Sequence, residues 1–448
     1  MNKIFLYLLI IIISFCDQAL ARQTLTLEES KQLALQNNYK IKNSKLEVDA
    51  AQQKKNAAFT KYFPTVSATG GSFKAQENLI EISTQGGNLP VYDGNPANLL
   101  APTQFAYLPD STMGLLKSGT LGMLTAVQPI FAGGRIVAGN QLASLGEDVG
   151  KYQSRLSQNE VLLRTEGQYW LVASLDEKLG TIHKYEELLD GLLQQTEDAY
   201  NVGIILKNDL LKVKLKRSEV LLNKSKVENG KTLATMAFCQ YLGIPYDPSL
   251  VLKDSLGVTE PPQAYYVDHT EALKNRTEYK LLQASIRAEE LQTKMKLGEY
   301  LPQAGIGVAA LYTKMDGGKD RTNEMIFGTL SIPLSGWWEA SHTLSERRVK
   351  EKIAQNNFND NSELLLLQMQ KAWQDLTDAY KQVLLSEEAK KQAEENLKMN
   401  QATYDNGLSN ITDLLEAQAM LQQVRDQLTD AKASYRSQLV LYLQITGR

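Results

Sequence analysis

The sequence predicts a mixed α/β membrane protein, in which a few membrane-spanning strands are joined to very long coiled-coil helices. Three observations predict this class: an internal repeat, four segments with strand periodicity, and two long stretches without proline, 134–201 and 339–405. Proline breaks a helix from within, and this chain of 448 residues contains only 12 prolines. At 1.5 Å per residue, each proline-free stretch could form a helix roughly 100 Å long.

The two halves of the chain match each other in residue order and spacing. Tyr62-Phe63-Pro64 corresponds to Tyr300-Leu301-Pro302 at a separation of 238 residues. Further along, the separation is 204 residues for three matches: Tyr200 with Tyr404, Gly203 with Gly407, and Asp209-Leu210 with Asp413-Leu414. Ordered matches at one separation indicate a duplication. The change in separation places 34 additional residues in the first half, between Pro64 and Pro129.

The repeat predicts the organisation of the chain. Each half should contain a helix, two strands around a loop, a long helix, a turn and a further helix. The expected segments are a signal peptide at 1–21, a first repeat at 22–243 (strands about 65–75 and 119–131, long helix about 134–201), a proline-rich linker at 244–266 in an equatorial region, and a second repeat at 267–448 (strands about 303–313 and 324–334, long helix about 339–405).

The segment 303–313 has the clearest strand pattern. Its apolar positions alternate with small or polar ones: Ala304, Ile306, Val308, Ala310 and Tyr312. A period of two predicts a strand with two different faces, and the length suits the ~9–11 residues of a membrane-spanning strand. In the segment 119–131 we expect Leu121, Met123 and Val127 to form the apolar face. Lipid outside and water inside would select such alternation.

Four strands cannot close a barrel, and unpaired strand edges are very costly in lipid. Other chains must therefore complete the sheet, and three chains would supply twelve strands, an even number as in bacterial barrels. A soluble pair of hairpins packed on helices is the alternative for these strands. The segment 84–118, rich in Gly, Pro, Asn and Leu, is expected to be an exposed, mobile loop between two strands.

The N-terminus resembles a secretory signal peptide. Lys3 is followed by an apolar run and by Ala19-Leu20-Ala21, a small-x-small cleavage site. An N-terminal membrane anchor and a lipid attached to Cys16 remain open alternatives. The net charge of −3 disfavours nucleic acid as a partner, since phosphate binding needs clustered positive charge. The histidines His183, His269 and His342 lie far apart without ligand spacing, so we expect no metal site. The sequence has neither a glycine-rich phosphate loop nor a nucleophile elbow, so we expect no cofactor and no enzymatic activity.

Several motifs resemble those of TolC-type outer-membrane factors, the outer membrane efflux protein family. They are Thr26-Leu27-Glu28-Glu29 with Leu33-Ala34-Leu35-Gln36-Asn37-Asn38, Tyr62-Phe63-Pro64-Thr65-Val66-Ser67, Gln128-Pro129-Ile130-Phe131-Ala132-Gly133-Gly134-Arg135, Ala199-Tyr200-Asn201-Val202-Gly203, and Tyr404-Asp405-Asn406-Gly407-Leu408. The resemblance covers nearly the whole mature chain. One departure is Ser335-Gly336-Trp337-Trp338, where the family usually has Phe-x-Gly-Gly.

The resemblance implies a homotrimer with a twelve-stranded β-barrel in the Gram-negative outer membrane and a twelve-helix barrel across the periplasm. It further implies an exit duct for efflux or type I secretion that serves an inner-membrane pump through a periplasmic adaptor protein. An exported soluble coiled-coil protein that binds partners is the alternative function. The sequence identifies neither the cargo nor the pump.

The candidate site residues lie at the two helix-to-helix turns. The resemblance implies that Asp413 and Glu416 line a closed aperture and that Tyr404 and Asp209 help to hold it shut. Lys212 occupies the position equivalent to Glu416, so the two could form an ion pair, while Ser409 stands where the family has a basic residue. The expected docking tips consist of six residues: Val202, Gly203, Ile204, Asn406, Gly407 and Leu408.

Overall fold

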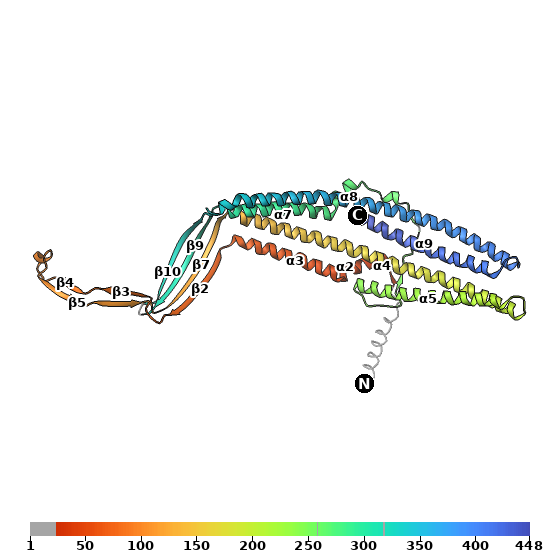
Figure 1. The fold of residues 1–448 in the computed structure, drawn as a ribbon, viewed down its shortest axis with the longest axis horizontal. Coiled ribbons are helices and arrows are strands. Elements are labelled where there is room, and N and C mark those ends of the chain that lie inside the picture. Colours follow the sequence, from red (N-terminus) through yellow and green to blue (C-terminus); the bar gives the residue numbers. More distant parts are fainter. Residues whose placement is uncertain (1–23, 258, 317–318) are drawn as a thin grey trace, which may run out of the picture. The chain divides into compact units, whose positions relative to one another are not determined.

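The computed structural model describes residues 24–257, 259–316 and 319–448 (Figure 1). The expected signal peptide and Cys16 lie outside these residues. The chain divides into two compact units, each treated separately below. Unit 1 comprises Met1–Gln52, Leu145–Arg287 and Lys352–Arg448, and unit 2 comprises Gln53–Ser144 and Ala288–Glu351.

Unit 2 contains a four-stranded antiparallel sheet with the order β10-β9-β7-β2. Its strands are β2 (Thr65–Lys74), β7 (Ser118–Ala132), β9 (Gln303–Met315) and β10 (Arg321–Ser331). Strands β2 and β10 form the two edges, and within the described residues neither has a second partner strand. The expected strand at about 324–334 is shifted, since β10 begins at Arg321 and ends before Pro333, which has no N–H to contribute to a ladder.

The strand register corrects one expected face. Val308 of β9 pairs with Ala126 of β7, so the apolar face of β9 continues on the even-numbered side of β7. Leu121, Met123 and Val127, which the sequence suggested as the apolar side of β7, lie instead on the opposite face, beside Thr313, Leu311 and Gly307. Each strand alternates correctly by itself, but only the pairing between strands decides which residues share a face.

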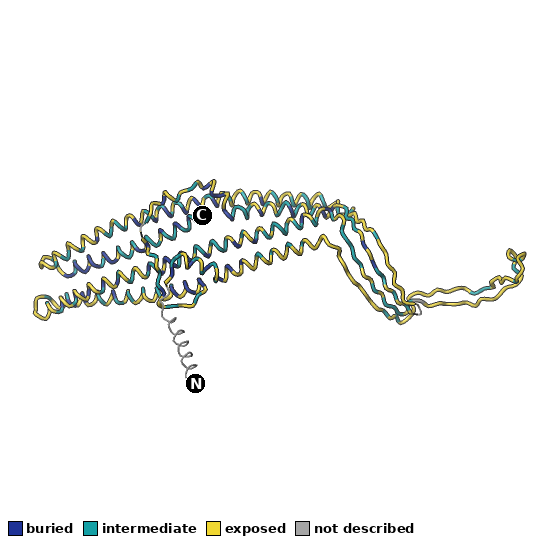
Figure 2. The backbone as a smooth tube through the Cα atoms, turned by 180° about the vertical axis from the view of Figure 1, so that it is seen from behind, coloured by how far each residue is buried: buried dark blue, intermediate teal, exposed yellow. Residues whose placement is uncertain are grey.

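The expected loop at 84–118 is largely paired strand. After β3 (Ile80–Thr84), the chain continues through β4 (Gly87–Val91), the short helix η2 (Pro96–Asn98), β5 (Gln104–Leu108) and β6 (Ser111–Leu115). β3 pairs with β6 and β4 with β5, both antiparallel. The segment is exposed, as expected (Figure 2). It forms a two-stranded ribbon, because the backbone N–H and C=O groups of its two arms satisfy each other by pairing.

The two connections from strand to long helix differ. Before α4 (Arg135–Asn201), Gly133 and Gly134 both have positive φ, of 63° and 77°. Before α8 (Gly336–Asp405), the chain turns without a positive φ, and the Trp337 indole donates a hydrogen bond to the Tyr300 carbonyl at 2.8 Å. The tryptophan therefore anchors the second connection where the glycine pair shapes the first.

The remaining elements are mainly helical. They are α2 (Leu27–Asn37), α3 (Tyr39–Phe59), η1 (Thr60–Tyr62), α5 (Lys207–Leu242), η3 (Pro262–Tyr265), α6 (His269–Asn275), α7 (Thr277–Glu299), α9 (Ile411–Ile445), and the two-residue strands β1 (Thr24–Leu25) and β8 (Val251–Leu252). No helix in the described part of the chain is both long and apolar enough to cross a membrane.

The helices of unit 1 pack through heptad-like apolar stripes. In α9, a stripe spaced three and four residues apart is buried or half-buried: Leu414, Ala417, Leu421, Val424, Leu428, Ala431 and Tyr435. This spacing is typical of coiled-coil seams. The linker 244–266 is mostly irregular and is fastened to the same helix, because the Tyr435 hydroxyl donates to the Glu260 carbonyl at 2.6 Å.

Candidate functional site: the two helix-hairpin turns

The two turns that join the long helices to their return helices have the same backbone design. Gly203 donates to the Tyr200 carbonyl at 2.9 Å, and Gly407 donates to the Tyr404 carbonyl at 2.9 Å. The next residue of each turn donates five positions back, Ile204 to Ala199 and Leu408 to Thr403. Both glycines have positive φ, 80° and 71°. This is the Schellman motif, for which glycine is the preferred residue.

The turns differ in how the following helix begins. Asn410 caps α9, and its side-chain oxygen accepts from the backbone N–H groups of Thr412 and Asp413 at 2.8 and 3.1 Å. The equivalent residue of the first turn is Leu206, which offers no side-chain cap to α5 and is 73% exposed. The second turn thus has a polar, fixed exit, and the first turn has an apolar one.

Lys212 connects the two helix hairpins at this end of unit 1. Its ammonium group donates to the Thr412 hydroxyl at 2.9 Å and lies 3.3 Å from the Asp209 carboxylate. Within one chain, Lys212 therefore pairs with Asp209 rather than with Glu416, the partner suggested from the sequence. Glu416 is exposed. Lys212 and Glu416 are separated by the same 204 residues as the two turn glycines. Equivalent positions on two helices nevertheless need not face each other.

Tyr404 forms a second connection between the hairpins. It is half-buried among apolar side chains of α4, α5 and α9 and hydrogen-bonds with Thr196 of α4. Burial raises the pKa of the Tyr404 phenol, and the nearby Asp209 carboxylate raises it further. Tyr404 and Asp209 are thus close enough to interact electrostatically, but the hydrogen-bond partner is Thr196. Sequence reasoning missed Thr196 and Thr412, because hydroxyl residues on long helices carry no distinctive signal.

Apolar packing surrounds these polar contacts. One buried cluster combines residues of α4, α5 and α9: Ile182, Tyr185, Leu189, Leu192, Val213, Val220, Ile411, Leu414 and Leu415. The cluster extends to within a turn of Lys212 and Tyr404. The polar contacts therefore lie at the end of a packed seam, between the buried cluster and the exposed turns.

Asp413 and Glu416 lie in the first two turns of α9. Among the described residues, the Lys212 ammonium group bonds to Asp209 and Thr412 and to neither of these two carboxylates. Asp413 is half-buried, and its position near the helix N-terminus is favourable for a negative charge. The tip residues are exposed: Val202 is 71% exposed, Ile204 77% and Leu408 80%. An exposed set of apolar side chains at a turn is a feature of contact surfaces.

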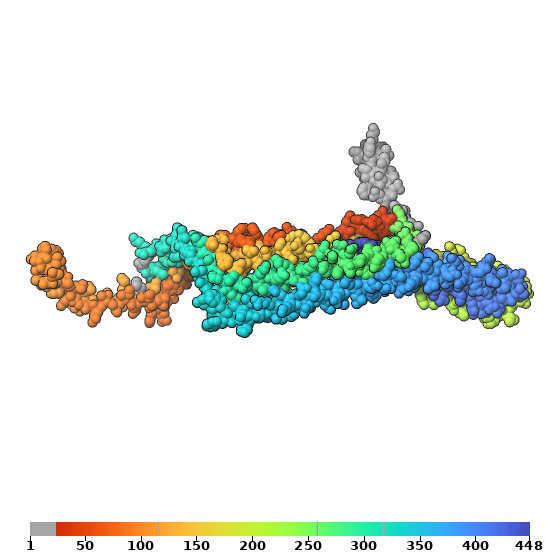
Figure 3. Space-filling model, turned by 90° about the horizontal axis from the view of Figure 1, so that it is seen from above, coloured from red at the N-terminus to blue at the C-terminus, as the bar shows by residue number. Residues whose placement is uncertain are grey.

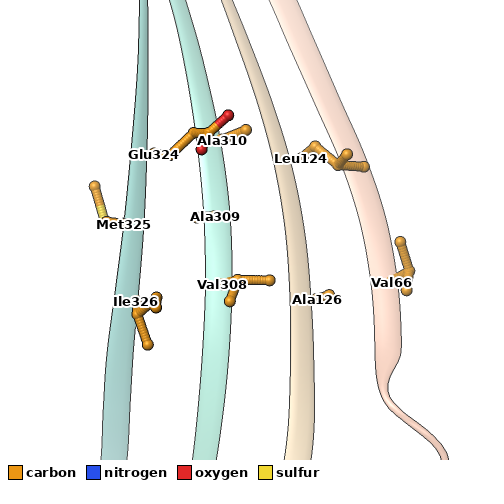
Figure 4. Close-up of a pocket in the computed structure, with 9 residues that line it drawn as sticks. All are labelled: Val66, Leu124, Ala126, Val308, Ala309, Ala310, Glu324, Met325 and Ile326. Carbon is orange, nitrogen blue, oxygen red and sulfur yellow. The ribbon is translucent and has the colours of Figure 1, made fainter.

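The sheet of unit 2 exposes apolar side chains on one face. Val66, Ala126, Val308 and Ile326 lie in one row across all four strands, and Leu124 and Ala310 lie in the next (Figure 4). On the other face of β9, Gly307 and Ala309 are buried. The residues of the apolar face line a hollow in the sheet (Figure 4). Aromatic side chains gather at the helix-side ends of the strands, with Phe59 stacked edge-on to Phe63.

Comparisons with known proteins agree with this arrangement. The family model "Outer membrane efflux protein" matches residues 270–448. Three solved structures are similar over 94% of this chain: VceC of Vibrio cholerae (14% identity, 96% of that chain, TM-score 0.71), the CmeC channel of Campylobacter jejuni (14%, 85%, 0.70) and the MtrE channel of Neisseria gonorrhoeae (12%, 88%, 0.72). At 12–14% sequence identity, the similarity to these structures shows a shared fold and nothing more specific. The search of curated protein sequences gave no match.

Proposed function

We propose that this chain, whose residues 270–448 belong to the outer membrane efflux protein family, is an outer-membrane exit duct that extends into the periplasm. It would conduct passively what an inner-membrane pump and a periplasmic adaptor deliver, and it would work as a homotrimer. CmeC and MtrE are described as outer membrane channels, which supports the same assignment here.

The observation that carries the proposal is the sheet with two open edges. Among the residues that the structure describes, strands β2 and β10 each have one partner strand. An open edge in lipid leaves N–H and C=O groups unpaired, at several kcal/mol each. The apolar face, with Val66, Leu124 and Ile326 all more than half exposed, suits contact with lipid. The sheet therefore needs both lipid and further strands.

Neighbouring copies can supply those strands in the correct direction. The four strands alternate in direction from β10 to β2, so the two edge strands are themselves antiparallel. When β2 of one copy meets β10 of the next, the alternation continues around a closed ring. Three copies give about twelve strands, within the range of bacterial outer-membrane barrels. The duplicated turn geometry supports an internal two-fold repeat, by which each copy would contribute four helices to a helical barrel.

The hairpin turns fit the two periplasmic tasks of such a duct. Val202, Gly203, Ile204, Asn406, Gly407 and Leu408 would contact the adaptor or pump. Asp209, Lys212 and Tyr404 would hold the aperture closed through few, half-exposed polar contacts, which a docking partner can shift because each is worth only about 1 kcal/mol. Asp413 and Glu416 would form rings of negative charge in the trimer, and such rings favour cations.

Fractionation and electrical recording test the proposal. Detergent extracts of the outer membrane should contain heat-resistant trimers that form cation-selective channels in planar bilayers. The variant Asp413→Asn with Glu416→Gln should lose cation selectivity and sensitivity to block by multivalent cations. Recovery of the chain in the soluble periplasmic fraction, with no conductance after reconstitution, would support a soluble coiled-coil protein instead.

A further inference from the structure

The ribbon formed by β3 to β6 is an insertion of the first half of the chain. It leaves the sheet at the ends of β2 and β7 that are opposite to the helices, and the Ala75 N–H continues the ladder to the Lys117 carbonyl at 2.8 Å. The second half connects β9 and β10 within residues 316–320. In Figure 3 the ribbon (orange) projects away from the rest of unit 2. No other described part of unit 2 covers the face of the ribbon that is in view.

The base of the ribbon has two different faces. Ile80, Ile82 and Met113 lie on one face and are 47%, 52% and 62% exposed. The opposite face carries Glu81, Ser83 and Thr112. An isolated two-stranded hairpin is at best marginally stable in water, so an apolar face of this kind indicates that the ribbon is covered by a partner.

The tip of the ribbon is fixed by one carboxylate. Asp93 accepts hydrogen bonds from the Asn95 N–H at 3.0 Å, the Asn98 amide at 2.7 Å and the Thr103 hydroxyl at 2.7 Å. These donors lower the pKa of Asp93 to about 2. The Asp93 carboxylate is therefore charged at neutral pH and can keep these three bonds, and the tip presents Leu100 fully exposed.

The charge distribution indicates what the partner is. The ribbon carries three charged residues, all acidic: Glu81, Asp93 and Asp110. Glu81 lies on the face opposite Ile80 and Ile82, the Asp93 carboxylate is engaged within the tip, and the Asp110 carboxylate accepts from the Gly86 N–H. The face with Ile80, Ile82 and Met113 has no charged side chain, so it offers nothing to attract a charged partner, and identical copies can meet through it without burying a charge. The ribbon also continues directly from β2, the edge strand that would adjoin the next copy in the trimer.

We propose that the three ribbons of a trimer pack their Ile80, Ile82 and Met113 faces against one another around the three-fold axis, as a collar at the outer mouth of the channel. This inference rests on the trimer proposed above. Each ribbon has one apolar face at its base, so three ribbons related by rotation bury that face together only when all three turn it towards the axis. Attachment to one barrel keeps the ribbons at high effective concentration, so each contact can be weak.

Single cysteines test this packing in intact cells. Cys239 is 1% exposed and burial raises its pKa, so it should not compete with an introduced thiol. In Ile82→Cys, a short, membrane-impermeant bis-maleimide should link two of the three subunits of nearly every trimer, so that about two thirds of the chains run as covalent dimers. Ser83→Cys, the neighbouring position on the opposite face, should remain uncrosslinked. Equal yields at the two positions would overturn the collar.

Three further measurements separate the collar from the trimer. Heat-resistant trimers should form in every variant, and their absence would contradict the proposed function, whereas trimers without the Ile82 crosslink would contradict the collar alone. Ile82→Ser with Met113→Ser should lower the temperature at which trimers dissociate, and Ser83→Ala with Thr112→Ala should not. If a fluorophore at Ile82→Cys is quenched by lipid-borne quenchers, lipid rather than a second copy covers this face, and the proposal is wrong.

Discussion

The two helix-hairpin turns share a backbone and differ in chemistry. Both end a helix of 67 or 70 residues with a left-handed glycine and the same pair of hydrogen bonds. The first turn then exposes Val202, Ile204 and Leu206, whereas the second leads through the Asn410 cap to Asp413. The two turns thus share their backbone geometry, while their side chains differ. We infer that both turns form the contact surface, and that Tyr404 beside the second turn also belongs to the gate.

A charged side chain at the glycine of the second turn should have the largest effect. Gly407→Glu should abolish export at a normal trimer level, because a charge at the tip blocks docking and a side chain at φ 71° costs roughly 1 kcal/mol. Gly407→Asn should retain export, since asparagine tolerates this conformation. The control is Gly191→Glu, at a helical position with open space. Export that survives both Gly407→Glu and Gly203→Glu would refute docking at the tips.

Removing the polar contacts beside the two turns should open the channel. Tyr404→Phe with Asp209→Ala removes the bond to Thr196 and the ion pair with Lys212, about 1 to 2 kcal/mol together, or about a five- to thirty-fold rise in the open population. Single-channel recordings should show this as higher conductance. Tyr200→Phe, the equivalent change in the first turn, should leave conductance unchanged. An equal effect of both would mean that the turns do not differ in function.

A charge exchange identifies the partner of Lys212. Lys212→Glu should raise conductance slightly, since a half-exposed pair contributes about 0.2 to 1 kcal/mol. Adding Asp209→Lys should restore the original value, because it rebuilds the pair at the same spacing. Adding Glu416→Lys should not. Restoration by Glu416→Lys instead would place the Lys212 contact between subunits.

The smallest effect concerns helix caps. Asn410→Ala should lower the stability of the second turn by about 1 kcal/mol, through loss of the cap on Thr412 and Asp413. Leu206→Asn should stabilise the first turn by a similar amount, provided that the new side chain accepts the equivalent bonds. Hydrogen exchange at the two turns measures both changes. Opposite signs support the comparison, and equal signs contradict it.

Much of this architecture could be predicted from the sequence because its signals are local. The proline-free stretch 134–201 contains α4, and the stretch 339–405 covers all of α8 except its first three residues. The alternation at 303–313 lies within β9. These patterns depend only on neighbouring residues. The family assignment also agrees with the match at residues 270–448. Local patterns do not determine how elements pair. The apolar side of β7 was therefore wrong, and the strands β3 to β6 were missed in a segment rich in glycine and proline.

The candidate site was predicted less completely for a similar reason. The turns themselves are visible as Gly203 and Gly407, which a Schellman motif requires. Which side chains meet depends on how two long helices are rotated against each other. Tyr404 consequently faces Thr196, and Lys212 faces Thr412 and Asp209, at positions that alignment of the two halves could not identify.

Crosslinking of the two sheet edges tests the central claim most directly. Thr69 of β2 and Asn323 of β10 lie in the same row of the sheet, at opposite edges. With cysteines scanned along both edges around these positions, oxidation in isolated outer membranes should give covalent dimers and trimers. Pairs of cysteines on β7 and β9, in the interior of the sheet, should give only intramolecular bonds. Edge cysteines that never link two copies in inserted protein would contradict a barrel completed by neighbouring chains.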